Sequence, residues 1–108
     1  MRTIEFKIVG NEIKKIPKFD YASVLKRDSN EPMQLKLTFP SEWANALKVV
    51  EFITRAGEEC EPQVLVDNAC MIPDKALSEY IFYMRVIGKT SDKKFETKKM
   101  AICRKGNK

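Results

Sequence analysis

The chain has 108 residues and a net charge of +5; 44% of its residues are hydrophobic, and it contains three cysteines but no histidine. This length allows one domain with its own hydrophobic core, and the lack of histidine excludes the common zinc sites, histidine-based acid-base catalysis and the Ser-His-Asp and Cys-His nucleophile systems. No run of residues approaches the roughly 20 apolar positions of a membrane-spanning helix, and the N-terminal stretch lacks the apolar core of a signal peptide. We therefore expect a soluble single domain, residues 1–108, that is made in the cytoplasm and has no membrane partner.

Alternation of polar and apolar residues dominates the first forty positions, and this pattern is typical of half-buried β-strands. The strands that this pattern predicts cover residues 4–8, 21–25 and 33–39. Gly10-Asn11 marks the turn that ends the first strand, and the turn-rich residues 27–32 close the second. Residues 13–19 repeat an apolar residue at every third position, but Pro17 forbids a helix interior, so we expect an irregular connection there.

The single tryptophan, Trp43, follows a Phe-Pro-Ser-Glu corner. Pro40 suits the first position of a turn, and Ser41 is a candidate cap for a short turn through Trp43 to Ala46. A buried tryptophan removes a large apolar area from water, and a carbonyl at the corner can accept its indole N–H. We therefore expect Trp43 to fill the core; the alternative is a hot spot in a protein interface.

The second half of the chain is also rich in strand signals. The strands predicted here cover residues 47–54, 63–66, 70–72, 81–87 and 94–103. Pro73 disfavours helix in the residue before it, residues 74–79 have room for one helical turn, and Gly88 is expected to end a strand. Six to eight short strands and at most one short helical turn predict an all-β fold, an antiparallel β-sandwich, with a closed small barrel as the alternative.

The residue types that carry chemistry are sparse. Cys60, Cys70 and Cys103 form no Cys-x-x-Cys pair, so we expect free, partly buried thiols; a bridge between Cys60 and Cys70 requires that they flank closely paired strands. The glutamates of residues 58–61 lack a further hard ligand at calcium-loop spacing, which favours a solvated loop tip over a metal site. No glycine-rich phosphate loop and no activated nucleophile is visible. We expect no catalytic residue, metal or cofactor.

Residues 89–108 hold 8 of the 20 basic residues but 2 of the 15 acidic residues. Clustered lysines can contact the phosphates of a nucleic acid. The candidate contact residues are Lys93, Lys94, Lys98, Lys99, Arg104 and Lys105. Phe95 is the one aromatic residue of this segment, which leaves no platform for base stacking. The alternative is a final strand whose lysines protect a sheet edge, followed by a solvated end.

Five segments together carry a resemblance to a known group of proteins. They are Phe-Pro-Ser-Glu-Trp at 39–43, Lys-Val-Val-Glu-Phe at 48–52, Cys-Met-Ile-Pro at 70–73, Ala-Leu at 76–77 and Ile-Phe-Tyr-Met-Arg-Val-Ile-Gly at 81–88. Over residues 35–88 the chain resembles small structural proteins encoded among the tail genes of phages and prophages of Gram-positive bacteria. The resemblance implies an immunoglobulin-like β-sandwich similar to the N-terminal domain of baseplate upper proteins, without catalytic residues.

The resemblance also implies that Trp43 packs between the sheets and that residues 70–73 form a buried strand end. The expected structural core therefore includes Trp43, Phe39, Phe52, Ile72 and Pro73. The implied function is that of a non-enzymatic tail or baseplate component, located in the virion or the host cytoplasm, that binds other phage structural proteins and itself through complementary surfaces and sheet edges. The alternative is a small phage-encoded regulator or inhibitor that binds nucleic acid or an acidic protein surface through residues 89–108.

Overall fold

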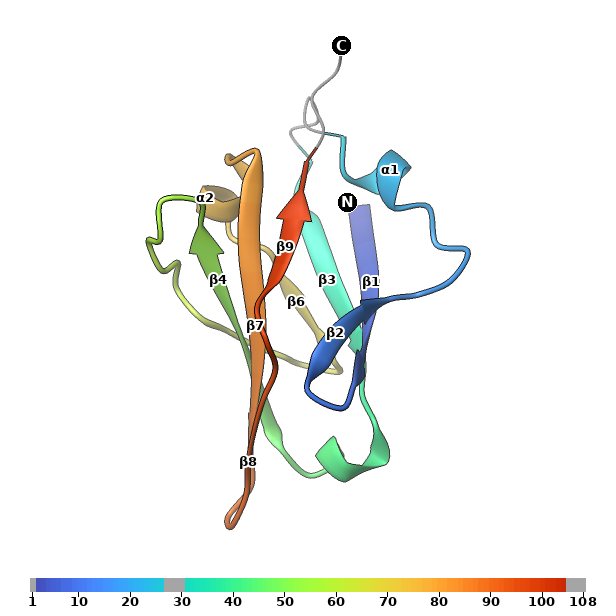
Figure 1. The fold of residues 1–108 in the computed structure, drawn as a ribbon, viewed down its shortest axis with the longest axis vertical. Helices are drawn as coiled ribbons and strands as arrows, with labels where there is room; N and C mark the ends of the chain where they lie inside the picture. The colour runs from blue at the N-terminus through green and yellow to red at the C-terminus, as the bar shows by residue number, and fades with distance from the viewer. Residues whose placement is uncertain (1, 27–30, 105–108) are drawn as a thin grey trace.

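The structure, a computed structural model, describes residues 2–26 and 31–104. In these residues two β-sheets pack face to face (Figure 1), which confirms the predicted all-β sandwich. The described strands are β1 (Arg2–Val9), β2 (Glu12–Lys15), β3 (Met33–Thr38), β4 (Leu47–Thr54), β5 (Gln63–Val64), β6 (Ala69–Met71), β7 (Ile81–Lys89), β8 (Lys94–Glu96) and β9 (Met100–Cys103). The described helical segments are α1 (Tyr21–Val24), the 3-10 turn η1 (Ser41–Trp43) and α2 (Asp74–Leu77). None of these helices is long and apolar enough to cross a membrane.

The two sheets differ in strand direction. One has the order β2-β1-β3-β6; in the other the order is β5-β4-β7, and both β8 and β9 pair with the far edge of β7. β1 and β3 run parallel, with Arg2 opposite Met33, whereas the sequence predicts purely antiparallel sheets. The parallel pair arises because the chain returns, between β1 and β3, to the end of the sheet where β1 begins. There the backbone N–H of Arg2 donates to the carbonyl of Pro32 at 3.2 Å.

The prediction of an irregular connection over residues 13–19 is wrong for residues 13–15, which form β2 together with Glu12 and pair with β1. Gly10 has a φ of +60° at the first position of a two-residue loop, the conformation that a tight type II′ hairpin needs. The return strand then places Ile13 inside, 7% exposed. Of the apolar residues spaced by three, Ile13 alone lies in β2, and Ile16 and Phe19 follow it. The spacing therefore did not indicate the hairpin.

The predicted strand over residues 21–25 is also wrong, because α1 is one turn of helix. Asp20 caps it, since its carboxylate accepts the N–H of Ser23 at 3.1 Å. The Tyr21 hydroxyl donates to the carbonyl of Glu5 and accepts the N–H of Ile16 at 2.7 Å. These bonds hold α1 beside β1. With α2, the described residues contain two α-helical turns besides the 3-10 turn η1, where at most one helical turn is expected.

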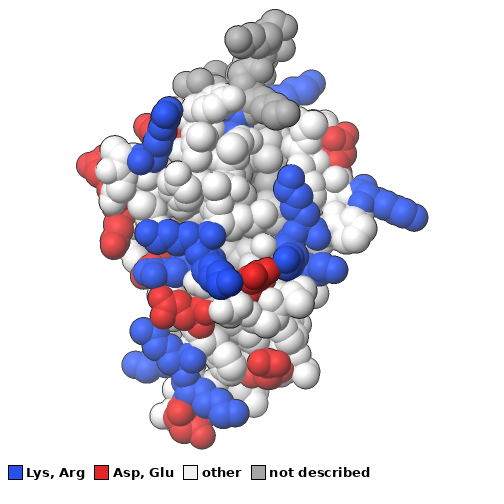
Figure 2. Space-filling model, in the orientation of Figure 1, with Lys and Arg blue, Asp and Glu red and all other residues white. Residues whose placement is uncertain are grey.

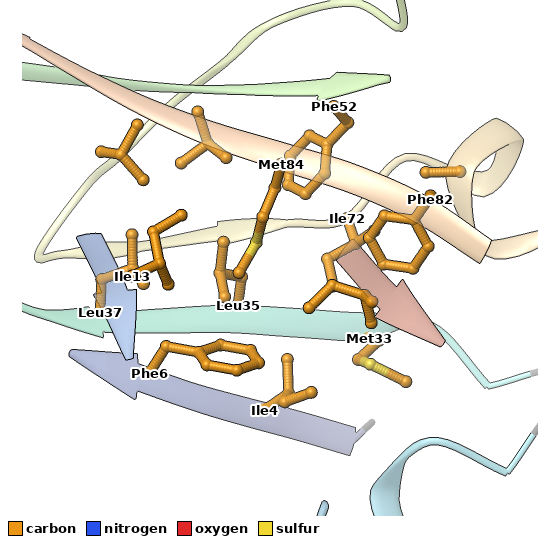
Figure 3. Close-up of a cluster of buried hydrophobic side chains, with 14 of the residues drawn as sticks. Ile4, Phe6, Ile13, Met33, Leu35, Leu37, Phe52, Ile72, Phe82 and Met84 are labelled. Carbon is orange, nitrogen blue, oxygen red and sulfur yellow. The ribbon is translucent and has the colours of Figure 1, made fainter. Parts of the chain in front are cut away.

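The core lies between the two sheets and is built by alternation of buried and less buried residues along β1, β3 and β7. Figure 3 shows Phe6 and Leu35 of one sheet facing Phe52 and Met84 of the other. The largest fully buried side chains are Trp43, Phe6, Phe52, Phe82, Ile4, Met33, Leu35, Met84, Val50 and Val86. Burying each such side chain contributes roughly 1.5–3 kcal/mol relative to leaving it exposed, so this layer supplies much of the driving force for folding.

The corner before β4 places Trp43 in the core, 1% exposed, as expected. Its ring stacks on Phe95 at a centroid distance of 4.9 Å and contacts Phe39 at 5.1 Å. The expected cap is wrong, because Pro40 occupies the N-cap position of η1 and no side chain caps the turn. The indole N–H is also buried without a hydrogen-bond partner among the described residues, where a corner carbonyl is expected.

The other expected core residues divide into two groups. Phe52 and Ile72 are buried, at 0% and 4% exposed. Phe39 and Pro73 are half-buried and lie at the margin of the core. Phe39 is only half-buried because it lies after the end of β3, where its ring contacts Trp43 and the ammonium group of Lys48 lies 5.1 Å from the ring centre.

The final strand predicted over residues 94–103 is interrupted. Ile87 pairs with Glu96 and Met84 pairs with Met100, so the edge strand carries one extra residue between them, which is a β-bulge. Thr97 is buried at the bulge, where its N–H donates to the Val86 carbonyl and its hydroxyl accepts the Val86 N–H, both at 2.9 Å. The bulge thus keeps both strands of the edge attached to β7.

Candidate protein-binding surfaces

The basic residues expected to form one contact surface do not lie together. Lys93 and Lys94 are exposed at the turn between β7 and β8, and Lys98 and Lys99 are exposed at the bulge. Lys105 lies outside the described residues. The predicted basic surface is therefore divided between the turn that precedes β8 and the bulge between β8 and β9.

Arg104 is a correction to that surface, because it is 3% exposed and serves the core. Its guanidinium donates to the backbone carbonyl of Leu77, and at 2.8 Å to that of Lys26. Its backbone N–H donates to the carbonyl of Tyr80 at 2.7 Å. Arg104 thus joins the end of β9 to the segments that follow α1 and α2, and a partner could not reach it without unfolding.

A groove lies between α1 and β9. It encloses about 280 Å³. Its lining is mostly apolar: Phe6, Lys15, Tyr21, Ala22, Leu25, Met100, Ala101, Ile102 and Cys103. Tyr21 positions the α1 wall through the hydroxyl bonds to the backbone of the first hairpin and a ring contact with Phe6 at 5.1 Å.

Basic residues border the end of the groove near the β1–β2 hairpin. Figure 2 shows Lys and Arg side chains gathered across the middle of this face, with one acidic group between them. Glu12 bonds Lys14 at 2.7 Å and lies 3.5 Å from the ammonium group of Lys98. The hydrogen bond from Lys14 and the nearby lysine charges lower the pKa of Glu12. The Lys15 ammonium group lies 5.3 Å from the centre of the Tyr21 ring.

A second surface covers one end of the outer face of the β5-β4-β7 sheet. Its exposed members are Leu47 of β4, Val64 of β5 and Val66, which lies just beyond the end of β5; they are 62%, 54% and 70% exposed. Val49 pairs with both Val64 and Ile87, and thereby joins the neighbouring strands. We call Leu47, Val49, Val64, Val66 and Ile87 the outer-face patch. Farther along the same face, Arg85 bonds Glu51 and Glu96, so the face becomes charged.

No cluster of groups for metal or nucleophile chemistry is found in residues 2–26 and 31–104. They contain no group of three or more histidine, cysteine or acidic side chains placed to hold a metal ion. The three cysteines are free, as predicted. Cys60 is buried, and burial raises the pKa of the Cys70 thiol to about 12, so neither is an activated nucleophile. Cys103 is exposed beside the groove.

Sequence reasoning missed both surfaces. For the outer-face patch a signal is present: residues 47–54 are apolar at positions of both faces, including Leu47, Val49, Val50 and Phe52. A strand with one solvated face would alternate more cleanly. For the groove no local signal exists, because its two walls come from segments about eighty residues apart in the chain, such as Tyr21 and Ile102.

Comparison with protein-family models, with curated proteins and with solved structures finds no match to this chain. The resemblance to phage tail proteins therefore stays a prediction.

Proposed function

We propose that this chain is a non-enzymatic protein that acts by assembling with other proteins, as a tail or baseplate component of a phage or prophage. The observation that carries the assembly role is the outer-face patch, in which Leu47, Val64 and Val66 are each more than half exposed. Contiguous apolar patches on a soluble protein commonly mark protein interfaces. The sequence resemblance over residues 35–88 supports the phage assignment.

The patch is suited to contacts between copies of the chain. It carries apolar side chains on neighbouring strands and ends at β5, a two-residue edge strand whose backbone is open to pairing. Symmetric assemblies bury the same patch on each subunit, and self-complementary apolar surfaces suit that geometry. Homo-oligomers in a virion, or in the host cytoplasm before assembly, follow from this proposal.

The oligomeric state tests the role of the patch. We expect the chain to elute as an oligomer in size exclusion with light scattering, and the double variant Leu47→Lys, Val66→Lys to be monomeric. Val9→Lys is the matched control, because Val9 is also apolar and 51% exposed but lies outside the patch. A monomeric wild-type chain, or an oligomer that the double variant leaves intact, would refute the patch as an assembly surface.

The phage assignment has its own test. Mass spectrometry of purified particles from an induced culture of the source strain should detect this chain in stoichiometric amounts. Its copy number relative to other tail proteins would then give the symmetry of the assembly. Absence from clean particles, with the chain abundant in the lysate, would reject the virion role.

The alternative role, a regulator that meets nucleic acid or an acidic protein surface through residues 89–108, is supported by the exposed lysines at positions 93, 94, 98 and 99. Truncation after Gly88 cannot test it, because it would remove the buried Thr97 of the bulge and Ile102 of β9. Replacing the four lysines by glutamine leaves the core intact. Binding of duplex DNA that these replacements abolish, and that weakens steeply with salt, would favour the regulator.

A further inference from the structure

The edge strand β9 presents backbone groups to the groove. β9 pairs with β7 on one side, and the N–H of Arg104 bonds the carbonyl of Tyr80 at the end of that ladder. In an antiparallel pair, alternate residues direct their N–H and C=O groups to the partner strand. Ile102 therefore faces β7, whereas the backbone groups of Ala101 and Cys103 point away from β7. An added strand could bond to them.

The groove beside this edge fits apolar side chains from such a strand. Its opposite wall is α1 with Leu25, which follows the helix, and Met100 and Ile102 contribute from the β9 side. Side chains of a strand alternate between faces, so every second residue of an added strand would enter the groove. The edge and the groove together are the two elements that strand addition uses, since backbone bonds give affinity and pockets give specificity.

Charge selects the chemistry of the partner. Lys15 lines the groove, and Lys98 and Lys99 border its end, while Glu12, the acidic residue between them, is engaged by lysines. A second copy of the chain is disfavoured, because its β9 segment carries Lys98 and Lys99 and would add positive charge to a groove that already contains Lys15. The excess of positive charge favours acidic residues in the occupant.

From these contacts we infer that β9 and the groove between α1 and β9 bind an extended segment of a partner protein, apolar at alternate positions and flanked by acidic residues, as an added β-strand. This inference rests on the proposed function in that the chain works by binding proteins, and it names one edge and one partner chemistry. The site is separate from the outer-face patch, so the two can fail independently.

Selection from a random peptide library displayed on yeast, with the full chain as bait, tests the inference. We expect enriched peptides in which apolar residues alternate, with Asp or Glu at one or both ends. The best of them is then synthesised with a fluorophore and measured by anisotropy. Absence of enriched peptides, or enrichment of peptides without acidic residues, would overturn the inference.

Backbone pairing is tested at Ala101, whose N–H points away from β7. Ala101→Pro removes that donor without removing a bond to β7. The affinity for the peptide should fall about tenfold, since one hydrogen bond is lost. Ala101→Val keeps the N–H and is the matched control. If the proline variant does not fold by circular dichroism, Ala22→Arg, on the exposed side of α1, blocks the groove and should abolish binding.

Two further variants separate the contributions. Lys98→Glu combined with Lys99→Glu should lower the affinity for the acidic peptide at low salt. A peptide in which lysines replace the acidic residues should bind the wild-type chain poorly. The outer-face variant Leu47→Lys, Val66→Lys should bind the peptide as wild type does, even if the oligomer is lost. Peptide binding that survives Ala101→Pro and Ala22→Arg, yet is lost in the outer-face variant, would place the peptide elsewhere and reject the groove.

Discussion

The indole ring of Trp43 lies directly against the backbone of Gly88. A Cβ atom at position 88 would lie 2.7 Å from Cε3 and 2.8 Å from Cζ3 of Trp43, closer than non-bonded carbon atoms approach. It would also lie 3.3 Å from the Cβ atom of Ala46. The tryptophan can therefore close this end of the sandwich because β7 carries a glycine where the ring crosses it. Gly88 lies inside β7 and does not end it, contrary to the sequence prediction.

Gly88→Ala should destabilise the protein by about 1–3 kcal/mol, because the new methyl group overpacks the core. Alanine otherwise suits a strand at least as well as glycine, so the sign of the change reports the contact with Trp43. Urea unfolding measures it. In a Trp43→Leu background the same substitution should cost much less, and an equal loss in both backgrounds would contradict the assigned contact.

Thr97→Val should cost about 1–3 kcal/mol in urea unfolding. The valine has nearly the same shape but cannot accept the N–H of Val86, which is then left buried without a partner. Thr97→Ser is the matched control, because it keeps the hydroxyl and should retain most of the stability. If valine and serine proved equally stable, the hydroxyl bond would not support the bulge.

Arg104→Leu should lower the free energy of unfolding by about 1.5–3 kcal/mol, since charged hydrogen bonds to the carbonyls of Leu77 and Lys26 are lost. Lys99→Leu, which removes a positive charge from an exposed site in the same segment, should change stability by less than about 0.5 kcal/mol. If Arg104→Leu were as stable as the wild-type chain, Arg104 would not support the core, and it would again be a candidate contact residue of the basic surface.

The three thiols should differ in reactivity. At pH 8 a thiol reagent such as DTNB should modify Cys103 rapidly in the native protein, while Cys60 and Cys70 react after denaturation. Cys103→Ser should abolish the rapid phase, and Cys70→Ala should leave it unchanged. Rapid modification of two or more thiols in the native chain would show that the core opens readily.

Alkaline pH should weaken the fold through Cys70. Burial raises the pKa of this thiol from an ordinary value of 9.0 to about 12, so the folded state holds the proton more tightly than the unfolded state. Its contribution to stability is therefore fully present below pH 9.0 and is lost as the pH rises toward about 12. Cys70→Ala should flatten this part of the pH profile in thermal unfolding, and an unchanged profile would contradict the burial of the thiol.

Local sequence patterns predict the central strands correctly. The alternation of Ile4, Phe6 and Ile8 correctly predicts β1, because a period of two matches a strand with one face in the core. Residues 47–54 correctly predict β4 because they are rich in β-branched and aromatic residues. The same reasoning failed at residues 12–15 and 21–24. There the outcome depends on pairing with β1 and on the bonds from Tyr21 to the backbone of Glu5, neither of which a local pattern contains.

The sequence by itself determined the fold class, the strands with strong alternation and the burial of Trp43, since hydrophobic burial acts on each residue according to its type and period. Tertiary structure alone decided that β1 and β3 pair in parallel, that Arg104 lies in the core while Lys98 faces solvent, and that α1 and β9 enclose a groove. These outcomes rest on contacts between distant segments. One period of side chains is compatible with many pairings, and packing of the whole chain selects among them.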